Sequence, residues 1–407
     1  MNRTHPLWLY ILFLTLLATA TDEFIIAGIL PAIATDLDVS IAAAGQLVTV
    51  FAVVYALGAP LLAVLFDRMP KRTVMVGGLA VFVLANVGAA VAPGYWALML
   101  TRIVAAAAAA IVTAAAFTTA AQGAPAGKQG RFLGVVVAGM TVALFTGVPL
   151  GSWLAGSIGW RAAFWLVAVV GLLAALGLLF TAPSVAGSEP APLRERLGAL
   201  RNVAVLRLVT VTFLAASGGL MFYSYLSVYT AEVSYGSYVL LSLLLFVVGA
   251  AGLAGALLAG RLTDAWGAQR TLRVVIGGHA VSLALLAALV WSGISSPIVL
   301  GIVITIWSVF AWGLNPPIQG SIISAAGPQV GMTALGLNIS GLYLGTGVAG
   351  ALGGAIISLA GIAFVPVAAT VLMLLSLLIT PRATGPSKPD EALLPLRSDQ
   401  RVGTEQA

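Results

Sequence analysis

Hydrophobic residues form twelve stretches along the chain, each long enough to cross a bilayer, and short polar segments separate them. The stretches cover residues 7–33, 42–66, 73–92, 96–122, 131–156, 162–181, 203–230, 237–262, 271–293, 297–325, 330–358 and 362–381. A spanning helix needs about 20 predominantly apolar residues. The pattern therefore predicts an all-α polytopic membrane protein with twelve transmembrane helices.

The longest internal polar segment, residues 182–202, falls between the sixth and seventh stretches. We predict an N-terminal six-helix bundle at 1–181, a cytoplasmic linker at 182–202 and a C-terminal six-helix bundle at 203–381. The polar tail at 382–407 is predicted to be disordered and cytoplasmic. The two halves echo each other, because AVLFDRMPKRTVM follows the second stretch and GRLTDAWGAQRTL follows the eighth. Two pseudo-symmetric six-helix bundles are the plan of a large class of secondary transporters.

Composition agrees with a membrane protein and restricts the chemistry. The chain is 60% hydrophobic and 8% charged, whereas a soluble domain is about 25% charged. It has no cysteine and two histidines, so we expect no disulfide, no metal site and no cofactor. His279, in the ninth stretch, is interpreted as a packed or interfacial histidine. No G-x-x-x-x-G-K-[ST] motif occurs, so an ion gradient or the substrate gradient itself must supply the energy.

The basic residues predict the orientation. If the N-terminus is cytoplasmic, all of the 19 Lys and Arg residues except Arg102 and Arg161 lie in cytoplasmic segments. This agrees with the positive-inside rule and predicts that both termini are cytoplasmic. The net charge of +6 is therefore a topology signal. A nucleic-acid-binding face would need clustered basic residues with aromatic residues between them, and no such cluster occurs, so we expect no nucleic-acid partner.

Two adjacent acids, Asp22 and Glu23, interrupt the first apolar stretch. An Asp at the centre of a spanning helix costs about 2.5–3.5 kcal/mol by insertion scales. Adjacent helical residues project about 100° apart, so only one of the two acids can point squarely into a central cavity. We predict that the pair couples transport to protons. The alternative is a structural role, in which a neutral acid forms a hydrogen bond with a neighbouring helix.

Arg102 is a basic residue within the fourth stretch, at a depth close to that of the two acids. An arginine in hydrocarbon must be paired or must reach water. We therefore predict an ion pair or hydrogen bond between Arg102 and the acids, and we assign Arg102 to the proton-coupling residues. The alternative is a side chain that extends to the outer headgroups.

The loop after the second stretch resembles the signature loop of the major facilitator superfamily, G-x-L-x-D-R-x-G-R-K-x-x-L. The chain has Ala63 and Pro70 where glycine is usual, and the residues that it keeps are Leu65, Asp67, Arg68, Lys71 and Arg72. The second copy of the loop, after the eighth stretch, keeps Asp264 and Arg270. Arg102 resembles the arginine of the second motif of this superfamily, where it is tied to proton coupling. In related pumps the acid is often at the position of Glu23, so the resemblance favours Glu23 as the proton carrier.

Other segments resemble one branch of this superfamily. GVPLG at 147–151 resembles the proline–glycine motif of drug:proton antiporters with twelve spans, and GWRAAFW at 159–165 also matches that group. Together with TDEF and GKQGR, these segments are most similar to the bacterial branch that contains chloramphenicol-resistance, sugar-efflux and purine-nucleoside-efflux proteins.

Charged loop residues and the proline–glycine motif are predicted to control gating. Asp67 can face a helix N-terminus of the opposite half or an arginine such as Arg131, which would form a cytoplasmic latch in the outward-facing state. Proline kinks a helix and glycine allows close helix contact, so the fifth helix is expected to kink and to press against the second half. The alternatives are a solvated basic loop and an ordinary kink. The predicted gating residues are Asp67, Arg68, Lys71, Arg72, Arg131, Asp264, Arg270, Gly147, Pro149 and Gly151.

Polar and aromatic residues near the middle of the membrane are candidates for the substrate cavity. They are Tyr55, Asn86, Thr113, Tyr223, Tyr225, Asn338 and Tyr343. Each of them is alternatively a hydrogen-bonding partner between helices or an interface anchor. The sequence NPP at 315–317 predicts a break in the tenth helix, and broken helices can line a substrate path.

The resemblance implies proton-coupled efflux of small amphipathic compounds, such as chloramphenicol or other drugs, by alternating access. It also implies a multi-pass transporter in the bacterial cytoplasmic (inner) membrane. The expected partners are a small-molecule substrate, protons and the lipid bilayer, and a monomer is the default for this fold. The alternatives are export of a pentose or purine nucleoside, or proton-coupled uptake on the same fold. An intramembrane enzyme is disfavoured, because it would need two aspartates on different helices or a Ser/His arrangement.

Overall fold

The computed structural model describes residues 6–66, 68–125, 128–183, 185–186, 202–234, 237–326 and 331–381. Every element in these ranges is a helix, and twelve helices or helix pairs are long and apolar enough to cross a membrane. The prediction of an all-helical protein with twelve spans is therefore confirmed. The predicted tail lies outside the described residues, as do Asp67 and most of the predicted linker.

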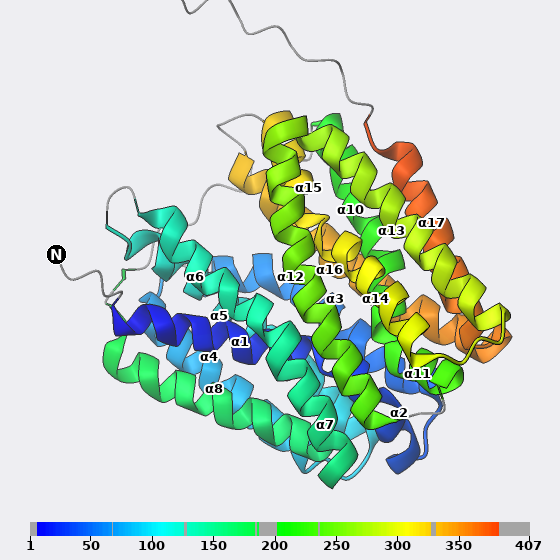
Figure 1. Cartoon of the computed structure of the whole chain (residues 1–407). Helices are drawn as coiled ribbons and strands as arrows, with labels where there is room; N and C mark the ends of the chain where they lie inside the picture. The colour runs from blue at the N-terminus through cyan, green and yellow to red at the C-terminus, as the bar shows by residue number, and fades with distance from the viewer. Residues whose placement is uncertain are drawn as a thin grey trace, which may run out of the picture.

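Helices α1–α8 form one bundle and helices α10–α17 form the other (Figure 1). The first bundle consists of α1 (Leu7–Phe24), α2 (Ile26–Asp36), α3 (Ile41–Phe66), α4 (Lys71–Ala90), α5 (Tyr95–Gln122), α6 (Gln129–Val142), the π-helix η1 (Ala143–Gly147), α7 (Val148–Ile158) and α8 (Arg161–Thr181). The second consists of α10 (Val203–Ser224), α11 (Leu226–Ser234), α12 (Tyr238–Trp266), α13 (Ala268–Trp291), α14 (Pro297–Trp312), α15 (Asn315–Ala326), α16 (Gly331–Ala360), the 3₁₀-helix η3 (Ile362–Phe364) and α17 (Val365–Ile379).

Three spans are interrupted. The tenth divides between α14 and α15, as the NPP sequence predicts. The first and seventh were expected to be continuous, and that expectation is wrong, because α1 ends before Ile25 and α10 ends before Tyr225. At the first interruption the backbone N–H of Gly28 bonds to the carbonyl of Ile25, three residues back, which tightens the turn. The two breaks lie at corresponding positions of the two halves, and Asp22 and Glu23 lie in the last turn before the first of them.

The fifth span contains a π-helical turn, η1, which ends at Gly147, two residues before Pro149. A π-turn is a recognised cause of a helix kink, and it lies in the same span as the proline from which the kink was predicted. The turn brings Phe145 against Gly249 of α12 in the other bundle. The fifth span therefore packs against the second half, as predicted.

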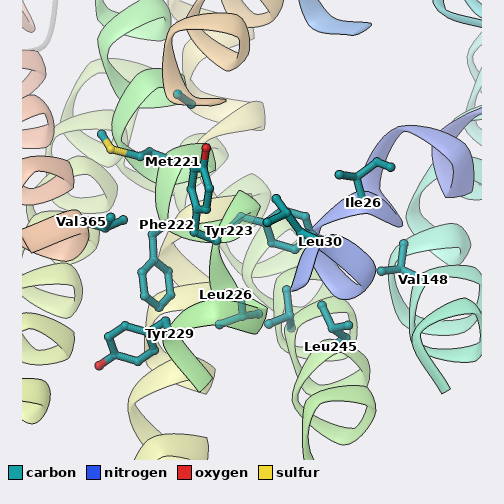
Figure 2. Packing of buried hydrophobic residues seen from close by; sticks show 14 of the residues in the cluster. Ile26, Leu30, Val148, Met221, Phe222, Tyr223, Leu226, Tyr229, Leu245 and Val365 are labelled. Atoms are coloured by element: carbon teal, nitrogen blue, oxygen red, sulfur yellow. The ribbon is translucent and has the colours of Figure 1, made fainter. Parts of the chain in front are cut away.

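The two bundles meet at one end and diverge toward the other (Figure 1). They converge around α2, α7 and α11, where the loops predicted to be outside the cell lie, and they diverge where α6 begins and α15 ends. At the closed end, Ile26 and Leu30 of α2 lie between Val148 of α7 and residues Tyr223 and Leu226 of the second bundle (Figure 2). One apolar cluster thus spans both bundles and closes one side of the molecule.

Small residues bring α3 and α16 into close contact across the bundle interface. A Cβ at Gly350 would lie 2.6 Å from the Thr49 hydroxyl oxygen and 3.1 Å from the carbonyl oxygen of Gly45. A Cβ at Gly354 would lie 3.0 Å from the Cα of Ala42. Such close approach of backbones is the usual role of glycine between membrane helices.

We expect Gly249→Ala to disturb the closed end. The added Cβ would lie 2.5 Å from the backbone nitrogen of Phe145, which only a shift of α12 or η1 can relieve. Gly260→Ala on the same helix is the matched control, because nothing lies within 4 Å of its Cβ. The chain has no cysteine, so spin labels can be placed at Ser40→Cys and Glu232→Cys and their separation measured by electron-spin resonance. Gly249→Ala should broaden the distances toward longer values; an unchanged distribution would show that this contact does not hold the bundles together.

Candidate functional site

Asp22 forms a buried ion pair with Arg102. A terminal guanidinium nitrogen of Arg102 lies 2.5 Å from Oδ1 of Asp22, and the other terminal nitrogen donates to the Asp22 backbone carbonyl at 3.1 Å. The side chains are 1% and 0% exposed, respectively. The predicted contact between Arg102 and the acid pair is therefore present, and Asp22 makes it. The alternative, a side chain that reaches the headgroups, does not fit this burial.

Aromatic rings complete the surroundings of the arginine. The guanidinium carbon of Arg102 lies 4.4 Å from the centroid of Phe51 on α3 and 5.7 Å from that of Phe164 on α8. Cation–π contacts of this kind gain strength when water is excluded. Arg102 thus links α1, α3, α5 and α8, and its charge is balanced by Asp22.

Glu23 points in a different direction from Asp22. The hydroxyl of Tyr343, on α16 of the second bundle, donates to Oε2 of Glu23 at 3.0 Å. Tyr55 of α3 stacks on the Tyr343 ring with the centroids 4.0 Å apart. Adjacent residues on a helix diverge by about 100°, which is why one acid is held inside the first bundle while the other faces the second. Glu23 is half-buried and Asp22 fully buried.

Two hollows adjoin Glu23. Both are lined by Glu23, Phe24, Leu220 and Thr346. The first also reaches Tyr223 and Phe51. The second, which we call the aromatic cavity, extends into the second bundle and has a volume of about 120 Å³. A cavity of roughly 150 Å³ can hold benzene, so this one has room for about one small ring. Its far end is lined by Gly219, His279, Trp307, Trp312 and Asn315.

The other predicted cavity residues have varied surroundings. Tyr55 and Tyr343 lie beside Glu23, and Tyr223 lines the first hollow. Asn86 and Thr113 are buried on α4 and α5. Tyr225 donates to the carbonyl of Gly350 at 2.6 Å, and Asn338 accepts a hydrogen bond from Thr212 at 2.6 Å. The hydrogen bonds of Tyr225 and Asn338 join helices within the second bundle, which is the alternative role expected for these residues.

The proline–glycine motif lies directly behind the acid pair. A Cβ at Gly147 would overlap the Thr21 side chain, and one at Gly151 would overlap Ile25, the residue at the break between α1 and α2. Pro149 lies in the first turn of α7. The two glycines therefore let the kinked fifth span pack against the interrupted first span, next to Asp22 and Glu23.

The predicted loop latch is only partly described. Asp67 lies outside the described residues. Arg68, Arg131 and Asp264 are exposed, Arg72 donates to the carbonyl of Leu179, and Arg270 lies over the Trp266 ring. Lys71 is buried at the start of α4. These residues lie where the bundles diverge, whereas a latch needs the bundles together there, so the latch stays a prediction.

Sequence reasoning missed the residues of the aromatic cavity. His279 was interpreted as a packed or interfacial side chain, and Trp307 and Trp312 were not singled out. The available signal was the NPP break, which correctly marked the tenth span as unusual. Trp307 and Trp312 belong to α14, directly before this break, and Asn315 begins α15 after it.

We expect Arg102→Ala to destabilise the protein severely. Removing one partner of a buried ion pair leaves the other charge unpaired, which typically costs about 3–5 kcal/mol. The matched control is Arg161→Ala, because Arg161 pairs with Asp36 at 2.6 Å but their side chains are 38% and 47% exposed. Surface pairs contribute little. Thermal unfolding in detergent should show a large loss of Tm for the first variant, a small loss for the second, and partial recovery in Asp22→Asn/Arg102→Gln. Equal losses for the two arginine variants would mean that burial does not set the strength of the pair.

Comparisons with known proteins agree with this architecture. The model of the Major Facilitator Superfamily matches residues 12–337. The uncharacterised MFS-type transporter YbcL of Bacillus subtilis (strain 168) is 36% identical over 363 residues, which cover 88% of this chain and 91% of the relative. The chloramphenicol resistance protein of Streptomyces lividans is 37% identical over 268 residues, which cover 65% of this chain and 68% of the relative.

Solved structures share the fold at low sequence identity. The crystal structure of a D-xylose-proton symporter superposes with a TM-score of 0.75 at 16% identity, over 91% of this chain and 96% of that one. Because the family model spans most of the twelve helices, and a relative that is 36% identical matches 88% of the chain, this multi-pass membrane protein belongs to the major facilitator superfamily of transporters.

Proposed function

We propose that the protein exports small amphipathic compounds in exchange for protons, by alternating access, with Glu23 as the group that carries the proton. The observation that supports this most strongly is the division of labour between the adjacent acids. Asp22 is fully buried and neutralised by Arg102, whereas Glu23 borders two hollows and contacts the opposite bundle. A carrier must gain and lose a proton in every cycle, so its carboxyl group must be accessible, as that of Glu23 is.

Competition at one carboxylate couples the two fluxes. Ionised Glu23 accepts hydrogen bonds from Tyr343 and from donor groups of a bound substrate. A proton that arrives from outside neutralises Glu23 and weakens both interactions, so the substrate leaves outward. After reorientation the proton leaves inward and the next substrate binds. Substrate and proton thus each lower the other's affinity, which is a reciprocal coupling.

The arrangement of the bundles supports one particular state of this cycle. The bundles meet at the predicted outer end and diverge at the predicted cytoplasmic end (Figure 1). With the orientation that the basic residues predict, this is an inward-facing arrangement in a bacterial cytoplasmic membrane, with both termini inside. In the opposite state, Asp67 and the neighbouring basic residues would come together as a latch.

Export of drug-like compounds is supported by the motif GVPLG, by the largely apolar and aromatic cavity, and by the similarity to a chloramphenicol resistance protein. Amphipathic compounds would place an apolar part among the aromatic rings and a donor group against Glu23. The contacts of the apolar part would provide the affinity for the compound, and the contact of the donor group with Glu23 would couple its transport to the proton.

The test is a proteoliposome assay with a pH-sensitive dye inside. Chloramphenicol, a lipophilic cation, a pentose and a nucleoside are added in turn, and proton movement is recorded. We expect at least one amphipathic compound to evoke proton movement in the wild type, and Glu23→Gln to abolish it because a glutamine side chain cannot carry a proton. The double variant Asp22→Asn/Arg102→Gln, which removes both charges of the ion pair, serves as the neighbouring comparison and should retain proton movement at a reduced rate. Counterflow of a compound without any proton movement would refute antiport.

Tyr343→Phe should weaken coupling more than binding. The variant keeps the ring that stacks on Tyr55 but loses the hydroxyl that donates to Glu23. We expect fewer protons to move per substrate molecule, because the lost bond is one to a charged group and such bonds contribute about 1.5–3 kcal/mol. Substrate counterflow should stay within about threefold of the wild type. Tyr225→Phe is the matched control, since its hydroxyl bonds to Gly350 within the second bundle. Equal coupling in the two variants would exclude Tyr343 as the link between Glu23 and the second bundle.

A further inference from the structure

The far end of the aromatic cavity holds polar atoms that the protein does not satisfy. His279 is 2% exposed and Trp307 is 0% exposed. Within the described part of the chain, neither ring nitrogen of His279 nor Nε1 of Trp307 has a hydrogen-bond partner. The two rings are neighbours, with centroids 6.1 Å apart in an edge-to-face arrangement. Three unsatisfied nitrogens therefore belong to two adjacent side chains that line one cavity.

The backbone makes space for this pair. Gly219 of α10 lines the same cavity, and a Cβ at that position would lie 2.6 Å from Cε1 and 3.1 Å from Nε2 of His279. A glycine is therefore needed for the imidazole to occupy its position. Phe222 packs on Trp307 with ring centroids 5.0 Å apart, which fixes the indole from the side. Both rings are held by packing and not by hydrogen bonds.

An unsatisfied buried donor is costly. Leaving such a group without a partner costs about 1–3 kcal/mol, and native proteins leave few of them. A neutral imidazole offers one N–H donor and one acceptor nitrogen, and an indole offers one N–H donor. A ligand atom that accepts a hydrogen bond from these N–H groups would remove this cost on binding. The affinity gained at this point therefore requires an acceptor atom in the ligand.

We propose that His279 and Trp307 form a substrate subsite that binds the acceptor oxygen, such as a carbonyl or nitro oxygen, of an uncharged aromatic compound. The ring of the compound lies in the aromatic cavity beside Trp307, and a hydroxyl or amide donor on its other end faces Glu23. This inference rests on the proposed function, because it names the class of compound that the exporter accepts. The compound would then be recognised at both of its ends. The contact with His279 sets which compounds bind, and the contact with Glu23 responds to protons.

The subsite can be tested without knowing the natural substrate. His5→Gln leaves His279 as the only histidine of the full chain, so ¹⁵N-histidine labelling in lipid nanodiscs reports on one imidazole. The probes are acetophenone and cumene, which have nearly the same shape and differ in the acceptor oxygen. We expect acetophenone to move the imidazole ¹⁵N signals saturably, and cumene at the same concentration to move them at most a third as far.

Variants of the two tryptophans locate the interaction. Trp307→Phe keeps an aromatic ring and removes the N–H, so the midpoint of the acetophenone titration should rise by about two- to tenfold, the loss of one hydrogen bond. Trp312→Phe is the matched control on the same cavity and should leave the midpoint within about twofold. Gly219→Ala should also raise the midpoint, because it displaces the imidazole.

Several results would overturn the proposal. They are an imidazole signal that neither probe moves, an equal response to both probes, or equal effects of the two tryptophan variants. The first outcome would mean that neither probe reaches the imidazole. The proton assay with Glu23→Gln is independent of these measurements. If no compound evokes proton movement in the wild type while the acetophenone response is intact, the proposed antiport is refuted and the subsite is kept. Proton movement that Glu23→Gln abolishes, without any acetophenone response, would refute the subsite and keep the antiport.

Discussion

The ion pair between Asp22 and Arg102 is the constraint around which the rest of the site is arranged. Neither charge could remain in the hydrocarbon region alone. Together the two side chains are fully buried, and a guanidinium nitrogen of Arg102 lies 2.5 Å from a carboxylate oxygen of Asp22. The pair ties the first span to the fourth and fixes the rotation of α1. Because the next residue projects about 100° away, this rotation turns Glu23 toward the second bundle. One buried interaction therefore determines which acid is enclosed in the first bundle and which borders the hollows.

Irregular backbone surrounds this pair and is made possible by small residues. The break at Ile25 follows the two acids, and the π-helical turn of the fifth span packs behind them. Gly147 and Gly151 allow this contact, since a side chain at either would overlap the first span. Irregular backbone at membrane depth is tolerated where it is buried in protein, and here both interruptions are covered by neighbouring helices. The site is thus held by rigid packing on one side and open to a hollow on the other.

The two halves have the same helical plan but different chemistry. The interruption at Tyr225 corresponds to that at Ile25, yet the second half has Phe222 and Tyr223 before its break where the first has Asp22 and Glu23. The buried ion pair and Glu23 therefore belong to the first bundle, whereas the second supplies aromatic surface with a few unsatisfied nitrogens. Glu23 and Tyr343 are the point at which the two chemistries meet. A compound with an aromatic part and a polar part suits such a boundary.

The sequence by itself determined the helical class, the twelve spans and the contact between Arg102 and the acid pair, because hydropathy and the cost of buried charge are local properties that a single chain reveals. It also located the break at NPP, since proline acts on its own helix. It did not reveal the breaks at Ile25 and Tyr225, which carry no proline and depend on packing between helices. Nor did it show which of the adjacent acids pairs with Arg102, or that His279 and Trp307 line one cavity. Those outcomes depend on how helices distant in the sequence rotate and pack against one another, and only the tertiary structure decides that.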